Sequence, residues 1–567
     1  MSGIGIRTQL CTPTPASGRS SKFGFSLLAV LLLFLTACAN QQQFAVTSAQ
    51  TISVSSALAA DQVLNRHLEA EPRSLDPSLG TAVVDELILE DLFEGLVTVA
   101  EDGSTIPGTA SSWETSADGK TWTFHIRKDA RWSNGAPVTA DDFVYAWRRQ
   151  VDPMTGSQYS QALAPIVNAM DIASGNMPVD KLGVESTGPA TLIVHLNAPT
   201  PYLLGLLTNM YLLPIYAPAV KQWGNAWTQP GHMISNGAFT LADRVINGHI
   251  TLLKNPDYWD AEHVHLTKVN YLVVSDFNAA INQYLSGDLD LTDRVPADVK
   301  ERLQMMLGDQ VVISPEFAST YFSFNMTKPP FAGNTKLRQA LNIAVDRDVF
   351  CKYVRRGIET PAYGIMPPLP GYDPYIPEWA KLSTDDRHAL ARKLYHEAGY
   401  SDRHPLETVL TYPSGGADIR QMMEALSAMW LVNLGAKVQI YNVEFKVLLE
   451  MREQKLPVLY WDAWFGDFPD PFTFMQLFQT GNGMNAGAYS NPQYDALIDQ
   501  ASRTNDQAVR FQLFRQAEAI LADDTPTVPV YSWASTHLIK PYLKGWKSNV
   551  MDRCLSQYMY ILAHKES

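Results

Sequence analysis

The sequence lacks the motifs of common catalytic and nucleotide-binding sites. Its 567 residues contain no G-x-x-x-x-G-K-[ST] phosphate loop, no G-x-S-x-G nucleophile turn and no H-E-x-x-H zinc helix. Basic runs are also missing, and the net charge is −14, with 44 Lys and Arg against 58 Asp and Glu. A negative surplus without a basic cluster argues against a nucleic-acid partner. The sequence therefore predicts neither a nucleotide hydrolase nor a nucleic-acid-binding protein.

Cysteine is scarce, with four residues in the chain. Neither the cysteines nor the scattered histidines have the spacing of metal ligands, so we expect no metal ion and no cofactor. Cys11 and Cys38 lie near the N-terminus, which leaves Cys351 and Cys554 for the folded part. Two cysteines in an oxidising compartment can form a disulfide. The sequence leaves open whether these two do.

One apolar run stands near the N-terminus. It extends from Phe25 to Leu35, follows three basic residues and leads into the sequence LTAC, which ends at Cys38. The run is short for a membrane span, and the order of charge, apolar run and small residues is typical of an export signal. The LTAC sequence resembles the bacterial lipobox. We therefore expect residues 1–37 to be a lipoprotein signal peptide and Cys38 to be lipidated; a plain signal peptide cut elsewhere is the alternative.

Residues 38–61 are rich in Gln, Ser and Ala and nearly uncharged. Such a composition predicts a flexible tether between the lipid and the folded body. Beyond it, helical and strand patterns alternate over two long blocks, and 567 residues are too many for one ordinary core. The sequence therefore predicts an α/β protein with two lobes.

The segment from Trp461 to Pro471, WDAWFGDFPDP, combines aromatic and acidic residues with two prolines. A short strand is expected at 456–460, and the prolines predict that irregular chain follows it. Aromatic faces beside Asp467 suit a ligand that is apolar along its length and cationic at one end. The alternative is an ordinary loop whose aromatics fill the core. A further alternative makes Asp462, Asp467 and Asp470 the acid and base of a glycoside hydrolase.

Several motifs in this chain occur together in one protein family. They are EPRSLDP at 71–77, DLFEGL at 91–96, SADGKTWTFHIRKDARWSNGAPVTADDFVYAWRR at 116–149, KNPDYWD at 254–260, LRQALNIAVDRD at 337–348 and WFGDFPDP at 464–471. With them the chain resembles the extracellular solute-binding proteins of family 5, the oligopeptide, dipeptide and nickel receptors of ABC importers. It is most similar to the oligopeptide and murein-peptide receptors. The resemblance covers the chain from about residue 64 to its end.

This resemblance implies a bilobal periplasmic-binding-protein fold of type II, cluster C, with an extra small domain on the first lobe. Its first lobe would comprise residues 62–97, 191–317 and 532–567, its accessory domain residues 98–190, and its second lobe residues 318–531. Peptide would lie between the lobes and be enclosed when they close.

The resemblance also implies roles for single residues. Asp467 falls where peptide receptors pair an aspartate with the ligand's α-ammonium. Two segments would bind the ligand backbone from opposite lobes, as an added strand does: Ala463, Trp464 and Phe465 on one side, and Thr81, Ala82 and Val83 on the other.

For the ligand's carboxylate, the chain matches the family pattern only in part. Lys328 and Arg452 fall on positions that meet this carboxylate in oligopeptide receptors. However, Trp461 replaces a second arginine and Ile419 replaces a histidine. The replacements favour longer peptides, or ligands modified at that end.

By this resemblance the protein is a binding component and not an enzyme. It would be a lipid-anchored monomer on the periplasmic side of the envelope that delivers peptides to permease and ATPase subunits. Other ligands of the family remain alternatives: a murein peptide, a nickel chelate or an oligosaccharide. A surface receptor for signalling peptides is a further one.

Overall fold

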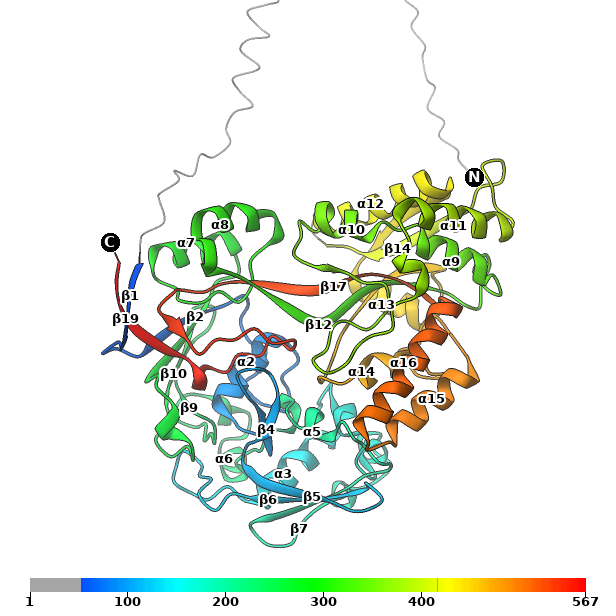
Figure 1. The fold of residues 1–567 in the computed structure, drawn as a ribbon. Coiled ribbons are helices and arrows are strands. Elements are labelled where there is room, and N and C mark those ends of the chain that lie inside the picture. The colour runs from blue at the N-terminus through cyan, green and yellow to red at the C-terminus, as the bar shows by residue number, and fades with distance from the viewer. Residues whose placement is uncertain (1–51, 416, 567) are drawn as a thin grey trace, which may run out of the picture. The chain divides into compact units, whose positions relative to one another are not determined.

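The computed structural model describes residues 52–415 and 417–566 (Figure 1). This part of the chain is built on two larger sheets and several small ones, with helices packed against them. We call the part around the four-stranded sheet β2-β11-β10-β9 the first lobe. The part around the six-stranded sheet β13-β17-β12-β16-β14-β15 is the second lobe. The described chain is therefore α/β, as the alternating pattern predicts.

The first lobe combines parallel and antiparallel strands. Strand β11 pairs in parallel with β2, whereas β10 pairs antiparallel with β11 and β9. Helix α2 buries Ile88, Leu89 and Leu92 in the same core as the sheet. Helices α7 and α8 pack in a separate core. The bounds are β2 Val63–Leu68, α2 Val83–Leu92, β9 Phe239–Val245, β10 His249–Lys254, β11 Lys268–Val273, α7 Phe277–Ser286 and α8 Lys300–Leu307.

An accessory sheet with strand order β5-β6-β8-β7 shares the core of the first lobe. Helix α3 covers it with Phe143 and Trp147, which are fully buried. The Asp142 carboxylate accepts a hydrogen bond from Thr139 N (2.8 Å), so the Thr-Ala-Asp-Asp sequence at 139–142 forms a capping box at the start of this helix. The bounds are β5 Ala110–Thr115, β6 Thr121–Ile126, α3 Ala140–Val151, β7 Val184–Ser186 and β8 Thr191–His195.

The accessory sheet continues past residue 190, where the sequence analysis ends the accessory domain. Strand β8 lies at 191–195 and pairs with both β6 and β7. Its alternating residues Leu192 and Val194 are fully buried in the shared core. Packing therefore continues across this expected boundary, and the division of the chain into domain ranges stays a prediction.

The six-stranded sheet of the second lobe is covered on both faces. Neighbouring residues of β12 belong to different cores: Tyr321 packs with α14, α15 and α16, whereas Phe322 packs with α9, α11 and α12. Adjacent strand residues point to opposite faces, so a helical layer lies on each side. The bounds are β12 Val311–Phe324, α9 Thr335–Ile343, β13 Thr360–Pro361, α11 Thr384–Glu397, β14 Glu407–Pro413, α12 Ala417–Leu434, β15 Lys437–Val443, β16 Leu459–Phe465, α14 Phe472–Met475, α15 Pro492–Ser502, α16 Gln507–Asp524 and β17 Thr527–Leu538.

Strands β12 and β17 join the two lobes. They run antiparallel, side by side, from the core of α7 and α8 to the core of the second lobe (Figure 1). Their register shifts between Pro315 and Ser319. In this stretch Phe317 N donates instead to Val550 O (2.6 Å). The chain therefore crosses between the lobes on two neighbouring strands that are locally released from each other.

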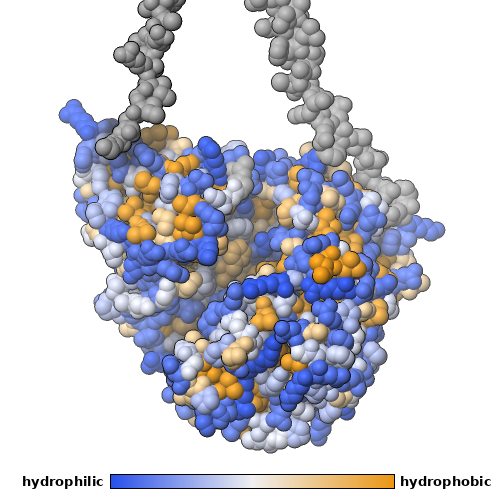
Figure 2. All heavy atoms as spheres, turned by 180° about the vertical axis from the view of Figure 1, so that it is seen from behind, coloured by the Kyte–Doolittle hydropathy of each residue, from blue (hydrophilic) through white to orange (hydrophobic). Residues whose placement is uncertain are grey.

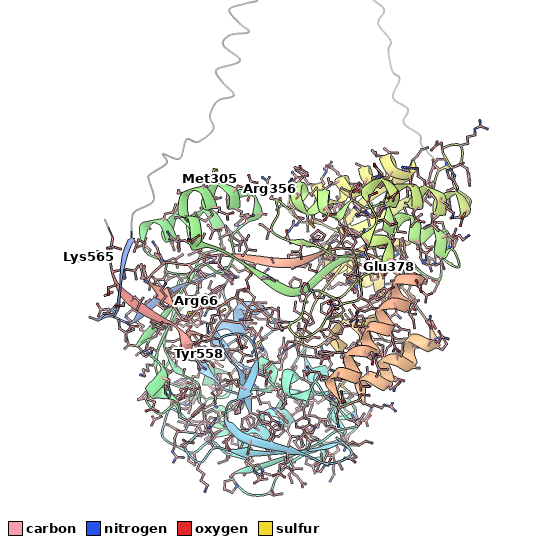
Figure 3. The ribbon with its side chains drawn as sticks, viewed as in Figure 1. Arg66, Met305, Arg356, Glu378, Tyr558 and Lys565 are labelled. Atoms are coloured by element: carbon pink, nitrogen blue, oxygen red, sulfur yellow. The ribbon has the colours of Figure 1, made fainter. Side chains whose placement is uncertain are left out.

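The remaining elements are short or peripheral. They are β3 Val97–Val99 and β4 Thr105–Pro107, which form a two-stranded sheet, α4 Ala169–Ala173, α5 Leu203–Leu206, α6 Ala217–Trp223, α10 Arg347–Val349, α13 Phe445–Glu453 and β18 Leu543–Lys544. The tip of α8 carries the exposed Met305 (Figure 3).

The described part of the expected tether is a strand. Residues Ile52–Leu58 form β1, which pairs antiparallel with β19 (Tyr560–Glu566). Most of β1 is exposed, so backbone pairing to the C-terminal strand, rather than burial, orders it. This corrects the expectation of flexibility for 52–58. The signal peptide, Cys38 and residues 39–51 of the expected tether lie outside the described residues.

Cys351 and Cys554 are both free and buried. Cys351 packs in the core of the second lobe and Cys554 in that of the first. Burial raises the pKa of each thiol to about 12. The two cysteines are therefore structural side chains without a disulfide. Within residues 52–415 and 417–566, the helices are too short or too polar to cross a bilayer.

Candidate functional site

A cavity of about 290 Å³ lies between the two lobes. Thr81, Ala82 and Val83 line it from the first lobe, and Phe465 and Asp467 line it from the second. Seen from behind, the surface of the molecule is hollowed between the lobes (Figure 2). Val83 is 57% exposed and Phe465 46%, although both are large apolar residues. Apolar side chains left open on facing walls are typical of a ligand site.

Asp467 reaches the cavity because Gly466 ties the preceding chain to the sheet. Gly466 N donates to Phe317 O (2.8 Å), which extends the contact of β16 with β12 by one residue. A Cβ at residue 466 would collide with the ring of Phe317. Glycine is therefore required here for the close approach of two chains, and it releases Asp467 from the strand directly at the cavity wall.

Thr473, fully buried at the start of α14, fixes the Asp467 side chain. Its hydroxyl donates to Asp467 Oδ2 (3.1 Å) and accepts from Asp467 N (3.2 Å) and Trp464 Nε1 (3.2 Å). One hydroxyl has one hydrogen to donate and two lone pairs, so its capacity is filled. The carboxylate is thus held by a neutral partner.

Asp467 forms no ion pair with any described residue. Although its side chain is accessible from the cavity, burial among the walls raises the pKa of its carboxyl above the ordinary value. The Thr473 hydrogen bond acts in the opposite direction, and the nearby Glu86 carboxylate raises the pKa further. The site therefore presents an anion without a cation.

The facing wall is the start of α2. Asp85 accepts hydrogen bonds from Thr81 N (2.7 Å) and Ala82 N (3.0 Å), and Ala82 is extended (φ −127°, ψ 157°). Asp85 is fully buried, so its carboxylate holds this turn from the protein interior. The anchoring presents the exposed Val83 to the cavity.

Strand β16 has an open edge at the cavity. It pairs with β12 along its length, but with β14 only at Leu459 and Tyr460. Because Gly466 N points to β12, the backbone groups of Trp464 also face β12, and those of Ala463 and Phe465 face away. No strand within residues 52–415 and 417–566 pairs with β16 on that side beyond Tyr460. The strand also continues five residues past the end expected from the prolines.

Arg452 and Lys328, to which the resemblance gives the ligand's carboxylate, do not line the cavity. Arg452 forms an ion pair with Asp462 (Nη2 to Oδ2, 3.0 Å), and both side chains are buried inside the second lobe. Burial raises the pKa of Asp462 to about 6, although Arg452 opposes this shift. Lys328 is half-buried and donates to Leu456 O (3.2 Å). Neither cation lines the cavity, because each is drawn to a partner in its own lobe.

Of the three aspartates considered for glycoside hydrolysis, Asp467 alone lines the cavity. Asp462 is paired with Arg452, and Asp470 is held by Arg510, whose Nη2 lies 2.6 Å from Oδ1. Both are committed to internal ion pairs. The arrangement offers no second carboxylate of this segment to act with Asp467.

The cavity also contains charged residues that the sequence analysis did not select. Glu86 and Glu90 come from α2, and Arg553 comes from the C-terminal segment. Their partners are hundreds of residues away in sequence, so no local motif marks them. Arg66 on β2 also lines the cavity (Figure 3), and its guanidinium donates to Cys554 O (3.0 Å) and Ser556 Oγ (3.2 Å).

A second charged group lies where the cavity reaches the crossing strands. Arg294 pairs with Glu316 (3.2 Å) and His537 with Asp552 (2.9 Å). Burial raises the pKa of Glu316 to about 7. These charges are matched within the first lobe and its connection to the second, unlike that of Asp467.

Known proteins share this architecture and much of this sequence. The family model "Bacterial extracellular solute-binding proteins, family 5 Middle" matches residues 104–486. The "Periplasmic oligopeptide-binding protein OppA" of Escherichia coli is 36% identical over 512 residues, which cover 89% of this chain and 94% of that protein.

Solved structures agree with the sequence comparison. The "MppA Periplasmic Murein Tripeptide Binding Protein, Unliganded Open Form" has a TM-score of 0.82 at 35% identity and covers 90% of this chain and 99% of that chain. The Haemophilus influenzae OppA complex with the peptide RPPGFSPFR has a TM-score of 0.72 at 33% identity, covering 89% and 100%.

Proposed function

Because this chain belongs to the bacterial extracellular solute-binding proteins of family 5, we propose that it binds oligopeptides between its lobes and delivers them to the permease of an ABC importer. It is a periplasmic solute-binding protein of the ABC importer type and not an enzyme. Asp467 carries the proposal for the ligand, because a carboxylate on the cavity without a cation suits the free amine of a peptide.

The ligand backbone is held by the open edge of β16. The outward carbonyl of Ala463 and the outward backbone groups of Phe465 can hydrogen-bond an extended peptide as an added strand, whereas Ala463 N donates to Asp462 Oδ1 (3.0 Å). Main-chain groups are the same in every residue, so this contact gives affinity with little sequence preference. The exposed Val83 covers the ligand from the opposite wall.

The amine fixes the register of the peptide on Asp467. A charge-assisted hydrogen bond of this kind contributes about 1.5–3 kcal/mol. Enclosing Asp467 without a cation costs several kcal/mol, because its charge would lose water without gaining a partner. A ligand with a free amine removes this cost and so favours the closed arrangement of the lobes.

The far end of the ligand needs no dedicated cation. Arg452 is paired with Asp462, and Lys328 lies outside the cavity lining. We therefore propose that peptides with a blocked C-terminus, or peptides that continue beyond the cavity, bind as well as those with a free carboxylate. This separates the chain from a receptor that measures peptide length by its two charged ends.

Calorimetric titration with matched peptides tests the role of the amine. A tetra-alanine peptide with a free amine should bind at least tenfold tighter than its N-acetylated form at neutral pH. The ammonium lowers the raised pKa of Asp467. At a pH between the pKa of Asp467 in the complex and its pKa in the free protein, binding therefore releases a proton. In that window affinity falls as the pH falls, by at most tenfold per pH unit.

The acetylated peptide is the control, because it has no ammonium to pair with Asp467 and so does not lower the pKa of that carboxyl. The Asp467→Asn variant should lose the pH dependence that separates the two peptides, even though Glu86, Thr473 and Tyr211 remain around the site. Equal affinities for both peptides at every pH would contradict the proposed amine pocket.

A lipid anchor at Cys38 accounts for the LTAC sequence. The Cys38→Ser variant should appear in the soluble fraction, whereas the wild-type protein sediments with membranes. Cys11→Ser is the matched control and should leave sedimentation unchanged, because Cys11 would be removed with the signal peptide. Immunoblotting of fractionated cells measures the distribution. A Cys38→Ser protein that still sediments with membranes would refute the anchor.

A further inference from the structure

The amine end of the cavity carries more negative charge than one ammonium neutralises. Glu86, from the first lobe, lines the cavity with Asp467 and lies near enough to raise the pKa of that carboxyl. Glu90 follows one helical turn later on α2. The charge at this end therefore depends on how Glu86 and Glu90 are paired.

Arg553 is the cation that contacts both glutamates, and its geometry favours Glu90. Its Nη2 donates hydrogen bonds to the Glu90 carboxylate and to Thr208 O (2.6 Å), and its Nη1 donates to Thr208 Oγ1 (2.9 Å). The distance from its Nε to Glu86 Oε1 is 3.7 Å, and this buried Nε makes no hydrogen bond. One guanidinium thus serves two carboxylates, and Glu86 has only a loose contact.

An aromatic stack lines the cavity near Glu86. Tyr159 and Tyr211 lie 4.3 Å apart between ring centroids at 10°. Burial, then Tyr159, then Glu86 raise the pKa of Tyr211, and Asp467 adds to this shift. The Tyr211 ring therefore lies within the field of both carboxylates. An aromatic surface beside carboxylates binds an extended side chain with a cationic end.

We propose that Glu86 and the Tyr159–Tyr211 stack form a subsite for a basic side chain on the first residue of the peptide. The inference rests on the proposed function, because Asp467 takes the α-ammonium. The side chain of a first Lys or Arg then runs along the tyrosines, and its charge meets Glu86. The ligand class is a peptide with two positive charges at its N-terminal end.

Arginine and citrulline have nearly the same shape but differ in charge, so matched peptides isolate the subsite. Arg-Ala-Ala-Ala should bind the wild-type protein about tenfold tighter than citrulline-Ala-Ala-Ala in calorimetry at low salt. Glu86→Gln should reduce this ratio to about one and leave the affinity for the citrulline peptide within about threefold. Glu262→Gln, an exposed residue far along the first lobe, is the control variant and should keep the wild-type ratio.

The outcomes separate the two proposals. If neither peptide binds the wild-type protein, the proposed function fails and the subsite fails with it. If both bind equally well, the subsite alone is overturned, without any variant. An unchanged ratio in a Glu86→Gln protein with wild-type circular dichroism also overturns it. If Glu86→Gln does not fold, Glu86→Asp, which keeps the charge but shortens the side chain, should fall below the wild-type ratio, and an unchanged ratio there would overturn the subsite.

Discussion

Replacing Asp467 with asparagine should weaken peptides that carry a free amine by about 10–100-fold, as expected for a charge-assisted bond of roughly 1.5–3 kcal/mol. Asparagine keeps the size of the side chain and can still accept from Thr473 Oγ1, so the loop should keep its conformation. The charge is what disappears. Isothermal titration of one peptide series against both proteins measures the loss.

The N-acetylated peptide is the decisive control for this variant. It binds without an ammonium, so Asp467→Asn should leave its affinity unchanged or improve it, because no charge is then enclosed uncompensated. A parallel loss for free and acetylated peptides would mean that the substitution disturbs the cavity wall and that Asp467 does not bind the amine.

Arg452→Ala should destabilise the protein by about 3–5 kcal/mol, because it leaves the buried Asp462 without its cation. The Arg452→Ala/Asp462→Ala double variant should recover much of this loss, since it removes both charges together. Denaturant unfolding of the two variants and the wild-type protein measures the free energies of unfolding. Similar losses in the single and double variants would show that Arg452 acts through packing against Tyr460 rather than through charge.

The pH dependence of the Arg452→Ala loss follows from Asp462. Its pKa is already raised to about 6 with Arg452 present, and it should rise further without it. A carboxyl with a raised folded-state pKa binds more protons folded than unfolded, so stability falls as the pH rises through this window. The difference from wild type should therefore shrink at acidic pH.

Ligand binding by this variant tests the role that the resemblance gave to Arg452. If Arg452 serves the fold, peptides with a free carboxylate and their amides should lose the same affinity. A selective loss for the free carboxylates would return Arg452 to the site and would require Asp462 to exchange partners on binding.

The α/β fold and the segment that brings Asp467 to the cavity were largely accessible from the sequence, for reasons that particular residues illustrate. A helix start such as that at Thr139 and Asp142 can be recognised from sequence, because a capping box depends on neighbours in the chain. Asp467 stood out because an acid, aromatics and prolines in one segment cannot continue a helix. The prolines, however, fall after Gly466, so they do not end β16 at residue 460, where the sequence predicts a strand end.

Long-range pairing is what the sequence could not reveal. Glu86 reads as an ordinary acid in the first turn of a helix, and Arg553 follows it by more than 460 residues. The partner of Arg452 is ten residues away, but α13 and β16 bring the two together only through packing in the second lobe. Strand β1 was missed because its partner is the opposite end of the chain.

The two crossing strands decide what kind of motion the lobes can make. Between Pro315 and Ser319, β12 and β17 give up their mutual register, whereas on either side they remain paired. Two covalent connections that lie next to each other favour bending of the lobes about the line through both crossings. They oppose rotation of one lobe against the other about any other axis. Lobe closure on a ligand would therefore leave the paired parts of β12 and β17 intact and would follow a single hinge axis.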